Sequence, residues 1–280
     1  MKRITSGDNR VFKEAVQLKQ KKYRDERNKY IIEGPNLIRE ALRNGGEIKL
    51  VILSEDCGED IFEKEFIKEG FSPETADIPM VMMPPGLFRR LSDTETPQGI
   101  LAVVKKKTYT EEEFFSPTPG PDAAGRNAPS NIIVLDRLQD PGNIGTIIRT
   151  ADAAGYLGAI LMKGTADIYS PKVVRAAAGS LFRLPVLFAE TPEQAIFWLK
   201  RHGKTVVCTA IAGRMPYYDA DLSENIALII GNEGNGVCEE FAAKSDLLVT
   251  IPMEGTVESL NAAAAAAILM YESVRQRRRG

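Results

Sequence analysis

Cysteine, histidine and long apolar runs are scarce in this chain, and each scarcity argues against a class of function. The three cysteines, Cys57, Cys208 and Cys238, stand far apart and form no Cys-x-x-Cys pair, which disfavours a disulfide framework and a structural zinc site. We expect buried or half-buried thiols instead. The single histidine, His202, stands in a Lys-Arg-His-Gly sequence typical of a helix C-terminus. Catalytic triads and histidine-bound metals are therefore disfavoured, and no metal is expected.

Signals for membrane insertion and export are also lacking. No apolar run reaches the roughly 18 residues that a transmembrane helix needs, so none is predicted. Residues 1–8 contain no apolar core of the kind that a secretory signal has. We therefore expect a cytoplasmic protein without a membrane partner.

Charge is nearly balanced over the 280 residues but uneven along them. The formal net charge of −2 argues mildly against a nucleic-acid partner. Residues 1–30 nevertheless carry ten Lys or Arg and four Asp or Glu, a net charge of +6, and residues 275–279 add four arginines. Either segment suits contact with phosphates, and either is equally compatible with a solvated helix face.

Apolar periodicity predicts two α/β parts joined by a linker. Strands and helices alternate through residues 1–106, with helices expected at 8–28, 35–42, 60–69 and 85–91 and strands at 30–32, 48–53, 79–83 and 99–104. Residues 107–130 contain four prolines and few aliphatic residues, which indicates a linker. Residues 131–280 carry further apolar runs of strand length, at 132–135, 159–162, 206–210, 226–230 and 247–251. These runs suit a mainly parallel sheet that is buried on both faces.

Ligands bind beyond the carboxyl ends of strands in such sheets, and the first polar segment at such an end is residues 136–150. It follows the strand that ends at Leu135 and has the sequence DRLQDPGNIGTIIRT. Its apolar residues recur on one helical face, and Arg149 lies off that face. A helix N-terminus after a strand suits an anion such as phosphate. An ordinary strand–loop–helix turn with Asn143 as the N-cap is the alternative.

The second segment is Gly-rich and the third precedes an alanine-rich helix. Residues 231–236 read GNEGNG directly after a predicted strand, and such glycines let a backbone approach a ligand closely. Their G-x-x-G-x-G spacing differs from the dinucleotide fingerprint, which disfavours the alternative of a nicotinamide-dependent enzyme. Residues 251–261 read IPMEGTVESLN, and six alanines follow. A helix that is apolar on every face is buried in a core or a subunit contact, and Ser259 or Asn261 is its expected cap.

In this order the three segments resemble the signature motifs of the SpoU, or TrmH-type, branch of the SPOUT RNA methyltransferases. The matching residues are Asn143, Gly145 and Arg149, then Gly231, Glu233 and Gly234, then Ile251-Pro252-Met253 with Ser259 and Asn261. Residues 174–180 resemble a further family stretch that often has Ser where Ala177 stands. Residues 33–35 and 92–100 resemble the family's substrate-binding domain.

The resemblance implies a small α/β RNA-binding domain, 1–106, followed by an α/β SPOUT domain, 131–280, with a C-terminal trefoil knot. It also implies a homodimer formed through the knotted region, which agrees with the alanine-rich helix. Members transfer a methyl group from S-adenosylmethionine to a ribose 2′-hydroxyl of RNA. The separate RNA-binding domain favours large-subunit (23S) ribosomal RNA over transfer RNA. A non-catalytic RNA-binding member of the fold is the alternative, which the intact motif residues disfavour.

Residue roles follow from the same resemblance. It implies catalytic roles for Asn143, Arg149, Glu233, Ser259 and Asn261, and cofactor contacts for Gly231, Asn232, Gly234, Ile251, Met253 and Leu260. Because a guanidinium does not readily lose a proton, we expect Arg149 to hold a phosphate and to stabilise developing alkoxide charge. We expect Asn143, Ser259 and Asn261 to orient groups by hydrogen bonding. Glu233 is expected to orient Arg149 or to accept a proton.

Overall fold

The chain folds into two compact units. The computed structural model describes residues 1–57, 78–116, 130–210 and 215–278. One unit comprises Met1–Lys107 with Asp167–Phe182, and the other comprises Thr108–Ala166 with Arg183–Gly280. In the part of the chain that is described, no helix has the length and apolar character needed to cross a membrane.

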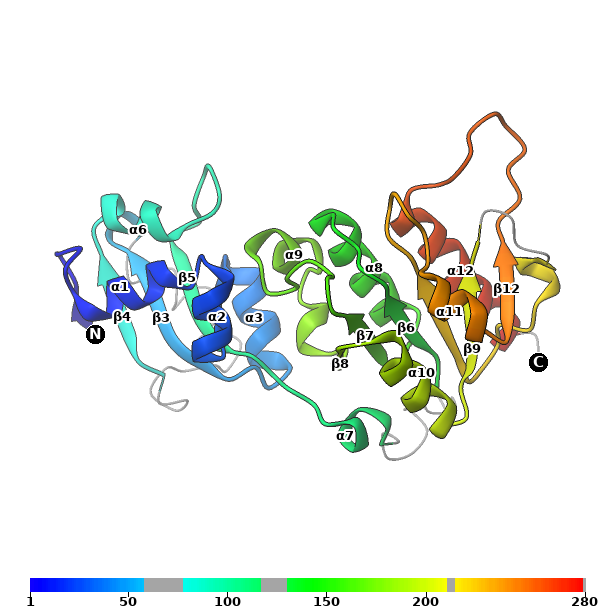
Figure 1. Ribbon diagram of the computed structural model, residues 1–280. Helices are drawn as coiled ribbons and strands as arrows, with labels where there is room; N and C mark the ends of the chain where they lie inside the picture. Colours follow the sequence, from blue (N-terminus) through cyan, green and yellow to red (C-terminus); the bar gives the residue numbers. More distant parts are fainter. Residues whose placement is uncertain (58–77, 117–129, 211–214, 279–280) are drawn as a thin grey trace. The chain divides into compact units, whose positions relative to one another are not determined.

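The first unit is built on a mixed sheet with strand order β1-β4-β3-β5-β2 (Figure 1). The described strands are β1 (Lys2–Arg3), β2 (Lys29–Glu33), β3 (Ile48–Ser54), β4 (Met80–Met83) and β5 (Ile100–Lys105). The described helices are α1 (Arg10–Gln17), α2 (Lys21–Arg27), α3 (Pro35–Arg43), α6 (Pro85–Leu91) and α9 (Pro171–Ala176), with a 3-10 turn, η1, at Glu55–Cys57. Strand β5 pairs antiparallel with both neighbours. Phe12 and Phe88 are buried against strand residues such as Ile52 and Leu101.

Most predicted elements of this unit are confirmed, but the predicted helix at 8–28 is two helices. The amides of Leu18, Lys19 and Gln20 bond to carbonyls three residues earlier, so the chain turns tightly between α1 and α2. Phe12, Ala15 and Leu18 are buried, whereas Lys21 and Lys22 after the break are exposed, so the amphipathic pattern holds for α1 and not over the whole predicted range. The helix predicted at 60–69 lies outside the described residues.

The second unit is built on an all-parallel sheet with strand order β10-β12-β9-β11-β6-β7-β8. Its described strands are β6 (Ile132–Leu135), β7 (Gly158–Met162), β8 (Val186–Ala189), β9 (Thr205–Thr209), β10 (Met215–Pro216), β11 (Ile226–Ile230) and β12 (Leu247–Thr250). Its described helices are α7 (Glu111–Phe115), α8 (Pro141–Ala153), α10 (Pro192–Arg201), α11 (Glu239–Lys244) and α12 (Ala262–Arg277), with a 3-10 turn, η4, at Tyr217–Asp219. A further 3-10 turn, η3 (Ser180–Phe182), belongs to the first unit.

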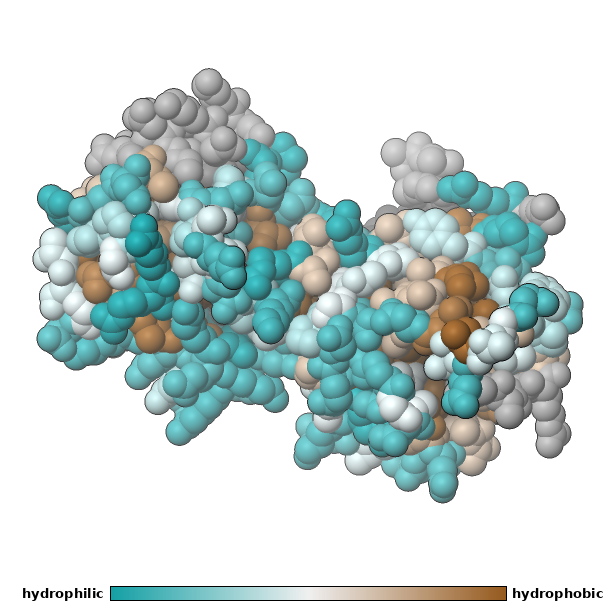
Figure 2. All heavy atoms as spheres, turned by 90° about the horizontal axis from the view of Figure 1, so that it is seen from above, coloured by the Kyte–Doolittle hydropathy of each residue, from teal (hydrophilic) through white to brown (hydrophobic). Residues whose placement is uncertain are grey.

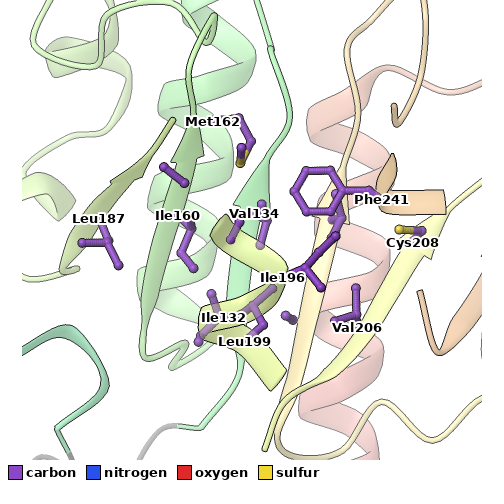
Figure 3. Packing of buried hydrophobic residues seen from close by; sticks show 14 of the residues in the cluster. Ile132, Val134, Ile160, Met162, Leu187, Ile196, Leu199, Val206, Cys208 and Phe241 are labelled. Atoms are coloured by element: carbon purple, nitrogen blue, oxygen red, sulfur yellow. The ribbon is translucent and has the colours of Figure 1, made fainter. Parts of the chain in front are cut away.

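Both faces of this sheet are covered, as the continuous apolar runs predicted. Helices α8 and α12 lie on one face, and α10 and α11 lie on the other (Figure 1). Figure 3 shows Ile196 and Leu199 of α10 and Phe241 of α11 packed against Val134 and Ile160 of the strands. Every residue of β6, β7 and β11 is buried, which leaves only the strand ends free to carry polar chemistry.

Part of the predicted linker folds with the second unit. Thr110 and Glu113 form a capping box that starts α7. Phe114 is 1% exposed, and it lies so close to Gly158 that a Cβ there would approach Phe114 Cε2 to 2.5 Å. Residues 108–116 therefore do not behave as a linker, and residues 117–129 lie outside the described residues. The prolines of the predicted linker all follow α7 in the sequence, and a helix of only five residues is too short to show clear apolar periodicity.

Candidate active site

Three loops of the second unit begin at the carboxyl edge of its sheet. Strands β6 and β11 pair directly, with Leu135 opposite Ile230, so the loops that follow them start side by side. The loop after β12 stands out at the same edge, at the top of Figure 1. These are the three segments that the sequence analysis selected.

A directed chain of amide hydrogen bonds joins these loops. The Oδ1 atom of Asn261 accepts hydrogen bonds from the backbone amides of Ala263 and Ala264, 2.9 and 3.2 Å away, and thereby caps α12. Its Nδ2 donates to Asn143 Oδ1 at 2.8 Å. Asn143 Nδ2 in turn donates to Glu233 Oε1 at 3.1 Å. Because the cap fixes the orientation of the first amide, the donor and acceptor of every later group are fixed as well.

Glu233 is the last group in this series of hydrogen bonds, and it binds backbone as well. Its carboxylate also accepts hydrogen bonds from the backbone amides of Gln139 and Asp140, each at 3.0 Å. Desolvation raises the pKa of Glu233, but these hydrogen bonds and the one from Asn143 outweigh it and leave the pKa below the ordinary value of 4.5. Glu233 is therefore ionised at neutral pH with both oxygens engaged, which makes it a poor proton acceptor. Within the described residues it binds the start of α8 and forms no hydrogen bond or ion pair with Arg149.

The alternative of Asn143 as an N-cap is wrong. Helix α8 begins at Pro141, and Asp140 caps it by accepting a hydrogen bond from the Asn143 amide at 2.8 Å. The side chain of Asn143 is thereby left for Asn261 and Glu233. The sequence held the missed signal, since an Asp followed by Pro is a common start of a helix.

The Gly-rich loop after β11 is tightly closed. Asn232 and Gly236 exchange two backbone hydrogen bonds of 3.0 and 2.9 Å. A Cβ on Gly231 would lie 2.1 Å from both Gly236 C and Val237 N, so only glycine fits there. Gly231 itself is buried, and the loop presents exposed backbone without side chains at Gly234 and Gly236.

The side chain of Asn232 makes this loop rigid and attaches it to the loop after β6. Its Oδ1 accepts hydrogen bonds from the amides of Gly234 and Asn235, each at 3.0 Å. Its Nδ2 donates to the Arg137 carbonyl at 2.8 Å. Both the oxygen and the nitrogen of the Asn232 side-chain amide are thus engaged in hydrogen bonds within the protein.

The remaining predicted residues stay outside this network. Arg149 is exposed on α8 and has no hydrogen bond or ion pair with any other described residue. Ser259 and Leu260 are exposed in the loop before α12, whereas Ile251 and Met253 are half-buried. The structure thus separates two groups: buried or bonded residues that hold the loops, and exposed residues that face solvent.

Apolar surface accompanies these loops. In the loop before α12, Val257 is 61% exposed and Leu260 is 37% exposed. Viewed from the side of that loop, the second unit shows hydrophobic atoms among hydrophilic ones (Figure 2). An adenosyl group, which joins a flat apolar ring to a polar ribose, fits such a combination of exposed apolar side chains and side-chain-free backbone.

An all-parallel α/β unit whose motif loops meet at the carboxyl edge is the architecture of the SPOUT methyltransferases. Comparison with known proteins agrees: residues 130–271 match the SpoU rRNA Methylase family, and residues 9–102 match the MRM3-like substrate binding domain. The chain therefore belongs to the SpoU rRNA methylase family. The predicted family and the predicted α/β fold with a parallel sheet are confirmed.

Relatives of known function match nearly the whole chain. The 23S rRNA (guanosine(2553)-2′-O)-methyltransferase RlmP of Bacillus subtilis is 38% identical over 271 residues, which are 97% of this chain and 98% of that protein. The 23S rRNA (uridine(2479)-2′-O)-methyltransferase of Streptomyces viridochromogenes is 30% identical over 288 residues, covering 99% and 93% of the two chains.

Solved structures match over the same extent. The AdoMet-bound rRNA methyltransferase from Sinorhizobium meliloti has a TM-score of 0.83 and 33% identity, covering 98% of this chain and 97% of that one. The SpoU methyltransferase AviRb from Streptomyces viridochromogenes, in complex with AdoMet, has a TM-score of 0.82 and 29% identity, covering 97% and 99%.

Proposed function

We propose that this chain is an S-adenosylmethionine-dependent methyltransferase that modifies a ribose 2′-hydroxyl of 23S ribosomal RNA in the cytoplasm. The observation that carries the proposal is the hydrogen-bonded chain from Asn261 through Asn143 to Glu233, because it joins all three motif loops at one edge of the sheet. The names of the Bacillus and Streptomyces relatives, both 23S rRNA 2′-O-methyltransferases, support the substrate.

The glycine loop and the loop before α12 are the proposed cofactor site. The residues that would hold S-adenosylmethionine are Gly231, Asn232, Gly234, Ile251, Met253 and Leu260. Gly234 offers exposed backbone without a side chain, and Leu260 offers exposed apolar surface. When bound, the cofactor supplies an electrophilic methyl group. AdoMet-bound structures of similar proteins support this assignment.

Arg149 and Ser259 are the proposed groups that face the RNA. The guanidinium of Arg149 is free to bind a phosphate beside the target ribose and to stabilise negative charge on the 2′-oxygen. The exposed hydroxyl of Ser259 is free to orient the ribose by hydrogen bonding. Asn143, Glu233 and Asn261 then act by holding the loops and not by transferring protons, because the side-chain atoms that join them are engaged with one another and with backbone amides.

The first unit is the proposed RNA-binding part. Its match to a substrate binding domain supports this role. Lys21 and Lys22 are exposed on α2, and Lys22 and Arg27 lie 5.8 and 5.6 Å from the centre of the Tyr23 ring. Cations that flank an aromatic ring suit both phosphates and bases.

Assembly as a homodimer through α12 belongs to the same proposal. Ala264, Ile268 and Tyr271 form an exposed stripe at helical spacing, and such self-complementary patches join two-fold dimers. Ala266, by contrast, is fully buried in its own chain. One face of α12 is therefore buried within its own chain, and the exposed stripe is the face left for a partner. The C-terminal trefoil knot is likewise proposed, and the match to AviRb over 97% of this chain supports it.

Methylation of defined RNAs by the purified protein tests this function. We expect labelled S-adenosylmethionine to modify 23S rRNA, and alkaline-resistance mapping to place the mark on a 2′-hydroxyl. Arg149→Ala serves as the inactive comparison. Modification of transfer RNA alone would contradict the substrate, and a base methyl group would contradict the chemistry. A protein that binds 23S rRNA but no S-adenosylmethionine would be a non-catalytic member of the fold.

A further inference from the structure

We propose that Asp136 is a positioning residue for methyl transfer, whose buried carboxylate holds the glycine loop of residues 231–238 in place. The proposal rests on the proposed function of this site. Asp136 directly follows β6, and it is 1% exposed. A buried carboxylate needs a charged partner and hydrogen bonds, so its neighbours reveal what it holds.

Asp136 binds the glycine loop at both of its ends. Its backbone amide donates to the carbonyl of Ile230, the last residue before the loop, at 2.9 Å. Its Oδ2 accepts a hydrogen bond from the amide of Cys238, the last residue of the loop, at 2.8 Å. One residue at the end of β6 therefore fixes where the chain leaves β11 and where it returns.

Arg137 supplies the balancing charge. Its Nε donates to Asp136 Oδ1 at 2.8 Å, and its Nη2 donates to Asp136 Oδ2 at 3.1 Å. Arg137 has φ of +60°, which is uncommon for a residue with a side chain. Its amide donates to Thr165 Oγ1, and its carbonyl accepts from Asn232 Nδ2. These bonds hold the unusual backbone, and they give the glycine loop a further attachment that depends on the same ion pair.

Asp136 and Glu233 attach the glycine loop at different places. Glu233 attaches the tip of the glycine loop to the start of α8, whereas Asp136 attaches the base of the loop. The loop is internally rigid through Asn232 and Gly236. A change at the base therefore moves the loop as a body, including the Gly231 backbone that would contact the cofactor, while the tip keeps its own bonds.

Hydrogen exchange and cofactor binding of Asp136→Asn test this role. Without cofactor, we expect faster amide exchange at residues 231–238. Because hydrogen bonds to charged groups are strong, we expect S-adenosylmethionine to bind on the order of tenfold more weakly by calorimetry. The KM for cofactor should rise with it, whereas kcat at saturating cofactor and the KM for RNA should change little.

Asp246→Asn is the matched control. Asp246 also accepts a backbone amide, that of Val206 at 2.7 Å, and pairs with Lys200. It lies just before β12, at the amino edge of the sheet. Its substitution should leave both cofactor affinity and exchange at 231–238 unchanged.

Unchanged exchange and unchanged cofactor affinity in Asp136→Asn would overturn the proposal. So would a lower melting temperature accompanied by wild-type cofactor affinity, since that result marks a purely structural residue. If Asp136→Asn does not fold, Arg137→Asn replaces it, because Asn tolerates positive φ; wild-type exchange and affinity in that variant would count against the proposal equally. If the wild-type protein binds no S-adenosylmethionine, the proposed function fails, and the exchange measurement still decides whether Asp136 holds the loop.

Discussion

The guanidinium of Arg24 and the carboxylate of Asp167 form a buried ion pair within the first unit. Arg24 Nε and Nη2 lie 2.9 and 2.5 Å from Asp167 Oδ2, and the two side chains are 5% and 11% exposed. Arg24 also donates to the carbonyls of Leu18 and Lys19, which links the turn between α1 and α2 to residues 167–182. One of the ten cations of residues 1–30 is thus structural and unavailable to RNA.

Breaking this pair should destabilise the protein. Removing one partner of a buried pair leaves the other charge uncompensated, so Asp167→Ala is expected to lower the free energy of unfolding by about 3 to 5 kcal/mol. Urea unfolding followed by circular dichroism measures this. Lys163→Ala is the control, because Lys163 and Glu190 are 73% and 71% exposed and such pairs contribute about 1 kcal/mol or less. Equal effects of the two substitutions would contradict the structural role of Arg24.

Arg149→Ala is expected to abolish methyl transfer while cofactor affinity stays within a few-fold of wild type. Losing a donor that stabilises transition-state charge costs about 10²- to 10³-fold in rate. Single-turnover kinetics with saturating RNA give the rate constant, and calorimetry gives the affinity. Arg201→Ala, which removes an exposed arginine at the end of α10, should keep the wild-type rate. A rate constant above half of wild type in Arg149→Ala would exclude the proposed role.

Gly231→Ala and Gly255→Ala should differ sharply. A Cβ at Gly231 would collide with the backbone of Gly236 and Val237, whereas one at Gly255 meets no atom within 4 Å. We expect Gly231→Ala to weaken S-adenosylmethionine binding at least about tenfold, because overpacking forces the loop to move. Gly255→Ala should bind the cofactor as wild type does. Similar affinities of the two variants would remove the glycine loop from the proposed cofactor site.

Replacing Lys21 and Lys22 together by Gln should weaken RNA binding and flatten its salt dependence. Each lost phosphate contact lowers the slope of log K against log salt by roughly 0.7 to 0.9. Filter binding at several salt concentrations measures the slope. Point substitutions are preferable to deleting residues 1–105, because that deletion would remove the partners of Asp167 and its buried neighbour Tyr169.

The control for this pair is Lys200→Gln with Arg201→Gln, which removes the same charge from adjacent exposed residues of α10. RNA affinity and salt slope should then match wild type. An equal loss in both double variants would mean that net charge, and not α2, sets RNA affinity.

Ile268→Glu should dissociate the proposed dimer, because it places an unpaired charge in the exposed apolar stripe of α12. Light scattering at assay concentration reports the mass, and activity should fall with it. Phe197→Glu, at a 61% exposed position of α10, should leave the mass unchanged. A fully active wild-type monomer would rule out this assembly. Ala266→Arg is unsuitable for the test, because Ala266 lies in the core of its own chain.

Local pattern alone predicted much of this protein. The apolar runs predicted β6, β11 and β12. Strands β6 and β11 are buried along their whole length, as continuous apolar sequence requires, whereas β12 is mostly half-buried. Gly155, with φ of +67°, directly follows the C-terminal cap of α8, where a glycine is common. The spacing of the three motifs identified the family and the edge of the sheet where the proposed site lies.

Only the tertiary structure decided which of the proposed site residues bond to one another and which remain exposed. The sequence predicted Ser259 or Asn261 as the cap of α12, and Asn261 is that cap. It could not show that Asn261 directs Asn143 toward Glu233, because the three lie up to 118 residues apart and meet only when β6 and β11 pair. Nor can the sequence show that Arg24, one of the ten cations of residues 1–30, is buried in an ion pair with Asp167. Sequence determines which groups a chain carries and their local conformation, whereas burial and partner choice arise from packing between distant segments.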